Sequence, residues 1–212
     1  MKYIISMAVA MGVAFTLTWL FGTNNEQIKN ENKPSKNKTE KAEQPAQAIK
    51  TKAENADVAD DGIITAPLSG KAVKLENVPD QTFAQGILGL GAAIEPTEGK
   101  VVAPGDGKVE TLFDTFHAVG LTLDNGKELL IHVGINTVEL KGEGFKAYVS
   151  EGDRVTKGQT LITFDMDFIK SKGYQTITPV LVGNSDEFAS VEELAEEGTE
   201  VTIGDRLIKV NA

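Results

Sequence analysis

The chain has 212 residues, which is enough for one domain of ordinary size together with accessory segments. It contains 21 Lys and Arg against 31 Asp and Glu, and the resulting formal net charge of -10 leaves nucleic-acid binding without its main driving force. It has no cysteine, so disulfides, thiolate metal sites and cysteine nucleophiles are excluded within this chain.

The first segment, MKYIISMAVAMGVAFTLTWLFG, is uncharged from Tyr3 to Gly22, about the length that spans a hydrocarbon core of roughly 30 Å as a helix. A cleaved signal peptide is the alternative, but its apolar region would be shorter and would end in small residues. The lysines lie mostly after this segment, at positions 29, 33, 36, 38 and 41, against Lys2 before it. The sequence therefore predicts a membrane helix within residues 1–22 and a cytoplasmic domain after it.

Residues 23–61 are polar and mixed in charge, and they are interpreted as a flexible linker. From residue 62 to residue 212, short apolar runs alternate with Gly, Pro, Asn and Asp, which predicts one all-β domain, a sandwich or barrel. The expected strands are 62–66, 71–75, 108–113, 118–123, 128–135, 160–164, 177–182, 200–203 and 207–210. Short helices are expected at 165–173 and at 190–198, the latter with Ser190 as N-cap and Gly198 as its end.

The two histidines of the chain, His117 and His132, lie on the two arms of one predicted hairpin. The DNGK segment is a strong turn signal, and a two-residue loop of Asn125 and Gly126 would pair Val119 with His132. Strand alternation would then place both histidines on one face as diagonal neighbours. Two converging imidazoles could bind a metal, act as acid and base, or accept a phosphoryl group. Zinc hydrolysis would need a third protein ligand, which only Asp or Glu could supply here.

The segment APLSGKAVKL, from Ala66, is similar to APGDGKVETL, from Ala103, and this internal repeat suggests a duplicated β unit. The segment VSEGDRVTKGQTLITF also resembles the turns of biotinyl and lipoyl carrier domains. However, the sequence offers no hairpin that would present a lysine for modification.

The motifs APLSG, VPDQTFAQGILGLGAAIEP, VVAPGDGKV, HAVGLTLDNGKELLIHVGINTVELKGEGF and TPVLVGN together resemble enzyme IIA of the glucose family of the bacterial phosphoenolpyruvate:sugar phosphotransferase system. The resemblance runs from about Ile63 to Val210. It implies a β-sandwich with a duplicated barrel-sandwich hybrid motif and short helices, and a phosphotransferase that needs no metal or organic cofactor.

The resemblance also implies residue roles. His132 matches the phosphoryl acceptor, His117 its stabilising neighbour, Thr115 the hydroxyl that orients His117, and Gly134 a backbone contact for the phosphoryl oxygens. An apolar docking surface is matched by Phe83, Ile87, Phe113 and Leu130, each of which could instead belong to the core. The implied partners are the histidine phosphocarrier protein, as donor, and enzymes IIB and IIC of a sugar permease; a cysteine of enzyme IIB receives the phosphoryl group.

The sequence departs from the family pattern at Asn136, where aspartate is usual, so a negative charge beside the site is lost. The segment AFTLTWLFG resembles the last membrane helix of enzyme IIC, which fits either a permease tail or an anchored enzyme IIA at the cell membrane. Two alternative functions are a regulatory binding module and a zinc endopeptidase of the lysostaphin type. The latter requires His-x-x-x-Asp and His-x-His, and the sequence has neither around its histidines.

Overall fold

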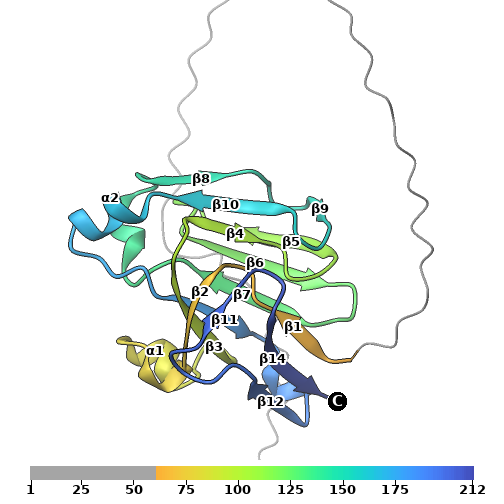
Figure 1. Cartoon of the computed structure of the whole chain (residues 1–212). Helices are drawn as coiled ribbons and strands as arrows, with labels where there is room; N and C mark the ends of the chain where they lie inside the picture. Colours follow the sequence, from red (N-terminus) through yellow and green to blue (C-terminus); the bar gives the residue numbers. More distant parts are fainter. Residues whose placement is uncertain (1–60) are drawn as a thin grey trace, which may run out of the picture. The chain divides into compact units, whose positions relative to one another are not determined.

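The computed structural model describes residues 61–212, which form one β-rich unit (Figure 1). The short apolar runs become strands of a large sheet with the order β13-β2-β3-β11-β7-β6-β5-β9. In that order the strands are Glu200–Val201, Gly70–Val73, Leu90–Pro96, Thr178–Val182, Glu128–His132, Ala118–Leu123, Gly107–Leu112 and Arg154–Val155. All of their pairings are antiparallel.

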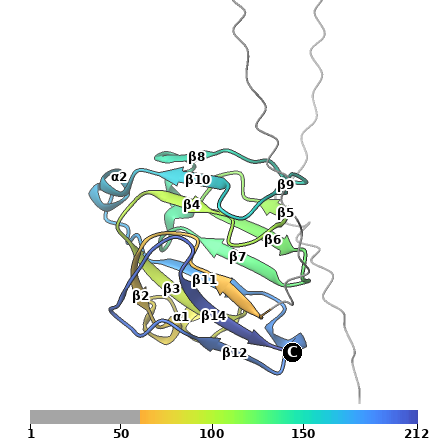
Figure 2. The same cartoon turned by 45° about the vertical axis from the view of Figure 1, so that its right-hand side comes forward.

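Two three-stranded sheets pack with the large one. The first is β1-β14-β12, formed by Ile63–Thr65, Arg206–Asn211 and Ser190–Glu193. The second is β4-β10-β8, formed by Lys100–Val102, Thr160–Phe164 and Phe145–Ala147. Figures 1 and 2 show these sheets at opposite ends of the unit. The remaining elements are α1 (Gln81–Ala84), α2 (Met166–Ser171) and the 3-10 turns η1 (Leu75–Asn77), η2 (Thr137–Leu140) and η3 (Ser185–Glu187).

The strand order confirms the duplication that the sequence suggested. Strands β4 to β10 form one repeat, and β1 to β3 with β11 to β14 form the other, because each three-stranded sheet joins the first, last and fifth strands of its repeat. Gly70 and Gly107 occupy the same position in the two similar segments. A Cβ on Gly70 would lie 2.1 Å from the Glu95 carbonyl oxygen, and one on Gly107 would lie 2.4 Å from that of Thr122. Both repeats therefore need glycine at this place, because a backbone carbonyl of the paired strand occupies the space of a Cβ.

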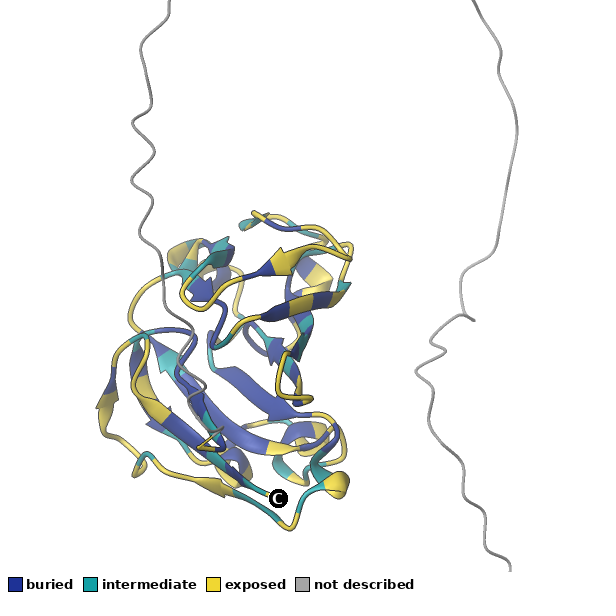
Figure 3. Cartoon of the chain, turned by 90° about the vertical axis from the view of Figure 1, so that its right-hand side faces the viewer, coloured by how far each residue is buried: buried dark blue, intermediate teal, exposed yellow. Residues whose placement is uncertain are grey.

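Two groups of buried side chains pack against the large sheet, and Figure 3 shows many residues of the strands coloured as buried. The main core lies between the sheets and contains Val119, Leu121, Leu129 and Ile131 of the β6–β7 hairpin. A smaller core lies on the outer face, where Leu75, Val78 and Phe83 of the η1–α1 segment cover Ala93, Ile135 and Leu181. The β7 residues Leu130 and His132 alternate with Leu129 and Ile131 and therefore belong to this outer face.

Most of the expected strands are present, and the helix expected at 165–173 is α2, where the Asp165 side chain accepts a hydrogen bond from the Phe168 N–H. The helix expected at 190–198 is wrong. Residues Ser190–Glu193 instead form β12, paired along β14, and the Ser190 hydroxyl bonds the Glu192 carboxylate rather than capping a helix. Pairing with a neighbouring strand has overridden the local capping signal.

The expected register of the β6–β7 hairpin is also wrong, by one residue. Ala118 pairs with His132 and Val119 with Ile131, because the loop contains Asp124, Asn125 and Gly126, closed by the Leu123 N–H to Lys127 carbonyl bond. Strand alternation therefore places Val119 and Leu121 on the inner face, opposite to the face of His132.

Residues 1–22, for which a membrane helix is expected, lie outside the described residues, as does almost all of the expected linker. Within residues 61–212, no helix is long and apolar enough to cross a membrane.

Candidate functional site

His132 is the last residue of β7, a strand that is paired on both edges, with β6 and with β11. Its Nδ1 atom lies 2.8 Å from the carbonyl oxygen of Gly134. Because a carbonyl oxygen only accepts hydrogen bonds, Nδ1 is the donor and carries the proton of the neutral ring. The lone pair of the neutral imidazole is thereby left on Nε2.

The turn after β7 requires glycine at position 134. Gly134 has φ 76°, and a Cβ there would lie 2.5 Å from Cγ2 of Thr137 and 2.7 Å from the Gln175 carbonyl oxygen. Asn136 also adopts the left-handed conformation, with φ 58°, which asparagine and aspartate tolerate better than most residues. Asparagine and aspartate both suit this backbone conformation, so Asn136 differs from the aspartate expected from the family pattern mainly in its lack of charge.

His117 lies in the loop between β5 and β6, immediately before β6, so the strand alternation expected to set the direction of its side chain does not apply. The Phe113 N–H donates to the Ala118 carbonyl and closes this loop, in which Phe116 has φ 54°. Strand alternation does not apply in such a loop, so the His117 ring can turn toward His132 in spite of the shifted register. The Thr115 hydroxyl lies 2.5 Å from Nδ1 of His117, and the His117 carbonyl accepts a hydrogen bond from the Val133 N–H.

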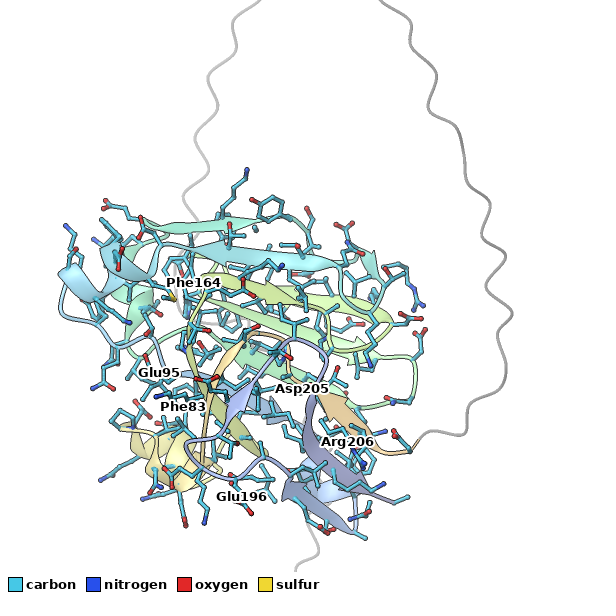
Figure 4. All side chains as sticks on the ribbon, viewed as in Figure 1. Phe83, Glu95, Phe164, Glu196, Asp205 and Arg206 are labelled. Carbon is cyan, nitrogen blue, oxygen red and sulfur yellow. The ribbon has the colours of Figure 1, made fainter. Side chains whose placement is uncertain are left out.

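The two imidazole rings meet edge to face, with centroids 4.9 Å apart and planes at 83°. Each ring also contacts a phenylalanine: Phe83 lies 5.0 Å from the His132 ring, and Phe113 lies 5.4 Å from the His117 ring. Figure 4 labels Phe83 at α1, on the outer side of the sheet. The site thus consists of two imidazoles in contact with each other and with two phenylalanine rings.

The four residues expected in a docking surface divide into two pairs. Phe83 is only 6% exposed and Leu130 packs against the same outer core, so both belong to the packing of this core and offer little surface to a partner. Ile87 is 66% exposed and Phe113 is 37% exposed. Leu88, Leu90 and Val138 are also exposed apolar residues, and the sequence did not predict them as part of a docking surface.

Burial keeps both imidazoles neutral. Desolvation by burial, together with a smaller effect of repulsion from His132, lowers the pKa of His117 to about 4. The pKa of His132 is also lowered, mainly by desolvation, against the hydrogen bond to Gly134 and the nearby negative charge of Asp80. Within residues 61–212, no group of three or more His, Cys, Asp or Glu side chains is placed to hold a metal ion.

Comparisons with known proteins identify the family. Residues 62–188 match the model of the phosphoenolpyruvate-dependent sugar phosphotransferase system EIIA 1 family. The chain is similar to the glucose-specific EIIA component of Halalkalibacterium halodurans, with 50% identity over 137 residues, 65% of this chain and 79% of that protein. It is also similar to that of Staphylococcus aureus, with 47% identity over 135 residues, 64% of this chain and 81% of that protein.

Among solved structures, the glucose permease IIA of Mycoplasma capricolum is similar, with a TM-score of 0.61 and 32% identity, covering 69% of this chain and 93% of that one. The fold and the matched residues define a phosphocarrier component of a sugar phosphotransferase system. The chain belongs to the EIIA family of that system.

The lowered pKa of His117 predicts how stability depends on pH. The unfolded chain protonates this imidazole below about pH 6.5, whereas the folded chain does so only near pH 4. The contribution of His117 to the free energy of unfolding should therefore be fully present above pH 6.5. The free energy of unfolding should fall by on the order of 3 kcal/mol as the pH decreases toward 4. Denaturant unfolding of the wild type and of His117→Gln measures this effect. The variant should lose less stability over that interval, and equal losses in both proteins would contradict the assignment.

Proposed function

We propose that Nε2 of His132 accepts the phosphoryl group from the phosphohistidine of the histidine phosphocarrier protein and passes it to a cysteine of enzyme IIB. The observation that carries this proposal is the Nδ1–H to Gly134 carbonyl bond, which leaves a lone pair on Nε2 beside a second imidazole. The names of the relatives contain glucose, so glucose is the sugar that we propose for this system.

The transfer needs a neutral nucleophile. Nε2 attacks phosphorus as the donor's P–N bond breaks, and the Nδ1 proton remains on the ring throughout. In the second step a thiolate sulfur of enzyme IIB forms the new P–S bond, while the bond between Nε2 and phosphorus breaks. The lowered pKa of His132 supports this role, because the neutral ring remains the major form at pH 7.

His117 is proposed to stabilise the charge of the phosphoryl group. If the Thr115 hydroxyl donates to Nδ1 of His117, the Nε2 atom of that ring carries the proton and can donate to a phosphoryl oxygen. The Gly134 N–H, which has no hydrogen-bond partner among the described residues, is a second proposed donor. Phosphoryl transfer depends mainly on such positioning and charge stabilisation.

The partners are proposed to dock on the exposed apolar residues Ile87 and Phe113, while Phe83 and Leu130 pack in the outer core. Residues 3–22 are proposed to span the cell membrane, with residues 62–212 as the enzyme IIA domain on its cytoplasmic side, next to enzymes IIB and IIC. Residues 23–61 would then act as the linker between them.

The first test concerns the acceptor. His132→Ala should abolish labelling by radioactive phosphoenolpyruvate in the presence of enzyme I and the histidine phosphocarrier protein, because the proposed nucleophile is gone. Tyr148→Phe, an exposed residue of the β8–β10 sheet region, is the control and should label like the wild type. Acid-labile phosphate at the wild-type level in His132→Ala would refute the proposal.

The second test separates acceptance from donation. A glutamine at position 117 can form one hydrogen bond but cannot become cationic, so His117→Gln should still accept the phosphoryl group. Onward transfer to enzyme IIB should fall by about 10²- to 10³-fold, the usual effect of removing one charge-stabilising donor. Both half-reactions are measured with purified partners, with Thr163→Val on β10 as control. Wild-type rates in both half-reactions would show that His117 has no such role.

The third test concerns the membrane. A protease added outside intact cells should leave residues 23–61 uncut, because the proposed orientation places them in the cytoplasm. In inverted vesicles the same protease should cut there and release the enzyme IIA domain. Cleavage in intact cells would show the opposite orientation, and recovery of the whole chain in the soluble fraction would exclude a membrane helix.

A further inference from the structure

The carbonyl group of Gly134 selects the reactive nitrogen of His132, so the residues that hold this carbonyl are part of the site. Glycine has no side chain to restrict it, and both peptide units that flank Gly134 could rotate unless other contacts fix them. Each peptide unit is planar, so a hydrogen bond to one of its groups fixes the direction of the other.

The peptide unit after Gly134 is held by the backbone. The N–H of Ile135 donates to the Gln175 carbonyl at 3.0 Å, as part of an isolated bridge between these residues. Because the Gly134 carbonyl belongs to the same peptide plane, it points away from Gln175. This contact orients the carbonyl toward Nδ1 of His132.

The peptide unit before Gly134 is held by a side chain. The Thr137 hydroxyl donates to the Val133 carbonyl at 2.5 Å, four residues back along the chain. Both residues are 0% exposed, so water cannot replace this donor without entering the core. Cγ2 of the same threonine occupies the space that a Cβ of Gly134 would fill. Thr137 therefore fixes the direction of the Gly134 N–H and limits the rotation of Gly134 as a whole.

We propose that Thr137 is a positioning residue for phosphoryl transfer: its buried hydroxyl locks the turn that presents the Gly134 carbonyl to Nδ1 of His132 and keeps Nε2 as the nucleophile. This inference rests on the proposed function of His132. Thr137 touches neither the phosphoryl group nor a partner, since it is fully buried.

The test compares Thr137→Val with Thr137→Ser. Valine keeps the shape but lacks the donor, so the turn should loosen and the ¹⁵N NMR shifts of His132 should report a mixture of tautomers instead of the Nδ1–H form. The kcat of phosphoryl acceptance should fall on the order of 10-fold. This is the lower end of the loss of activity, about 10- to 100-fold, that follows when a residue that orients a metal-ligating histidine is mutated. KM for the histidine phosphocarrier protein should stay constant. Serine keeps the hydroxyl and should preserve both the tautomer and kcat.

Thr65→Val is the matched control. Thr65 is also a buried threonine whose hydroxyl donates to a backbone carbonyl, that of Pro104, at 2.9 Å, but it lies on β1 in another sheet. Its loss should lower stability and leave the His132 tautomer and kcat unchanged. An equal change of tautomer in Thr65→Val would show a general loosening of the fold and would overturn the proposal.

The remaining outcomes are also decisive. A wild-type tautomer in Thr137→Val, with or without a change of kcat, contradicts the proposal, and so does loss of the tautomer in Thr137→Ser. If Thr137→Val does not fold, the wild type supplies the test: the Thr137 hydroxyl proton should exchange with water as slowly as the His132 Nδ1 proton, and rapid exchange would refute the lock. Failure of His132 to accept phosphate would overturn the proposed function alone, because the tautomer is measured without phosphate.

Discussion

Strand β7 is hydrogen-bonded on both edges, and the geometry of the site depends on this double pairing. Its pairing with β6 brings the end of β7 beside the loop that carries His117, and its pairing with β11 joins the two repeats in one sheet. The last paired residue is His132. An imidazole at this position has a fixed backbone on the strand side and a tight turn on the other, so its ring can be aligned with one carbonyl.

The site combines apolar burial with a small number of polar contacts. Phe83 and Phe113 contact the two imidazoles and help remove water from them, and the resulting desolvation keeps both rings neutral. Neutral imidazoles can remain adjacent, whereas two imidazolium ions at a ring separation of 4.9 Å would repel. The same desolvation that provides a neutral nucleophile would strengthen the contacts to a bound phosphoryl group.

The duplicated frame carries this site in only one of its repeats. The motif IHVG, which contains His132, corresponds to VLVG at the end of β11, where Leu181 takes the equivalent place. Both residues face the outer side of the sheet, but Leu181 is fully buried in the outer core beneath the η1–α1 segment. One repeat therefore supplies polar chemistry at this position while the other supplies packing.

The sequence by itself determined the all-β class, the duplication, α2 and the family, because turn residues, alternating apolar runs and dense motifs are local signals. It also selected His117, His132, Thr115 and Gly134. Only the tertiary structure decided the hairpin register, the position of His117 in a loop and the strand at Ser190–Glu193, since each depends on pairing between distant segments. It also revealed Thr137 behind the turn, where no sequence signal distinguishes a core threonine from one that fixes a peptide plane. Such roles follow from the direction of a hydrogen bond, which folding alone establishes.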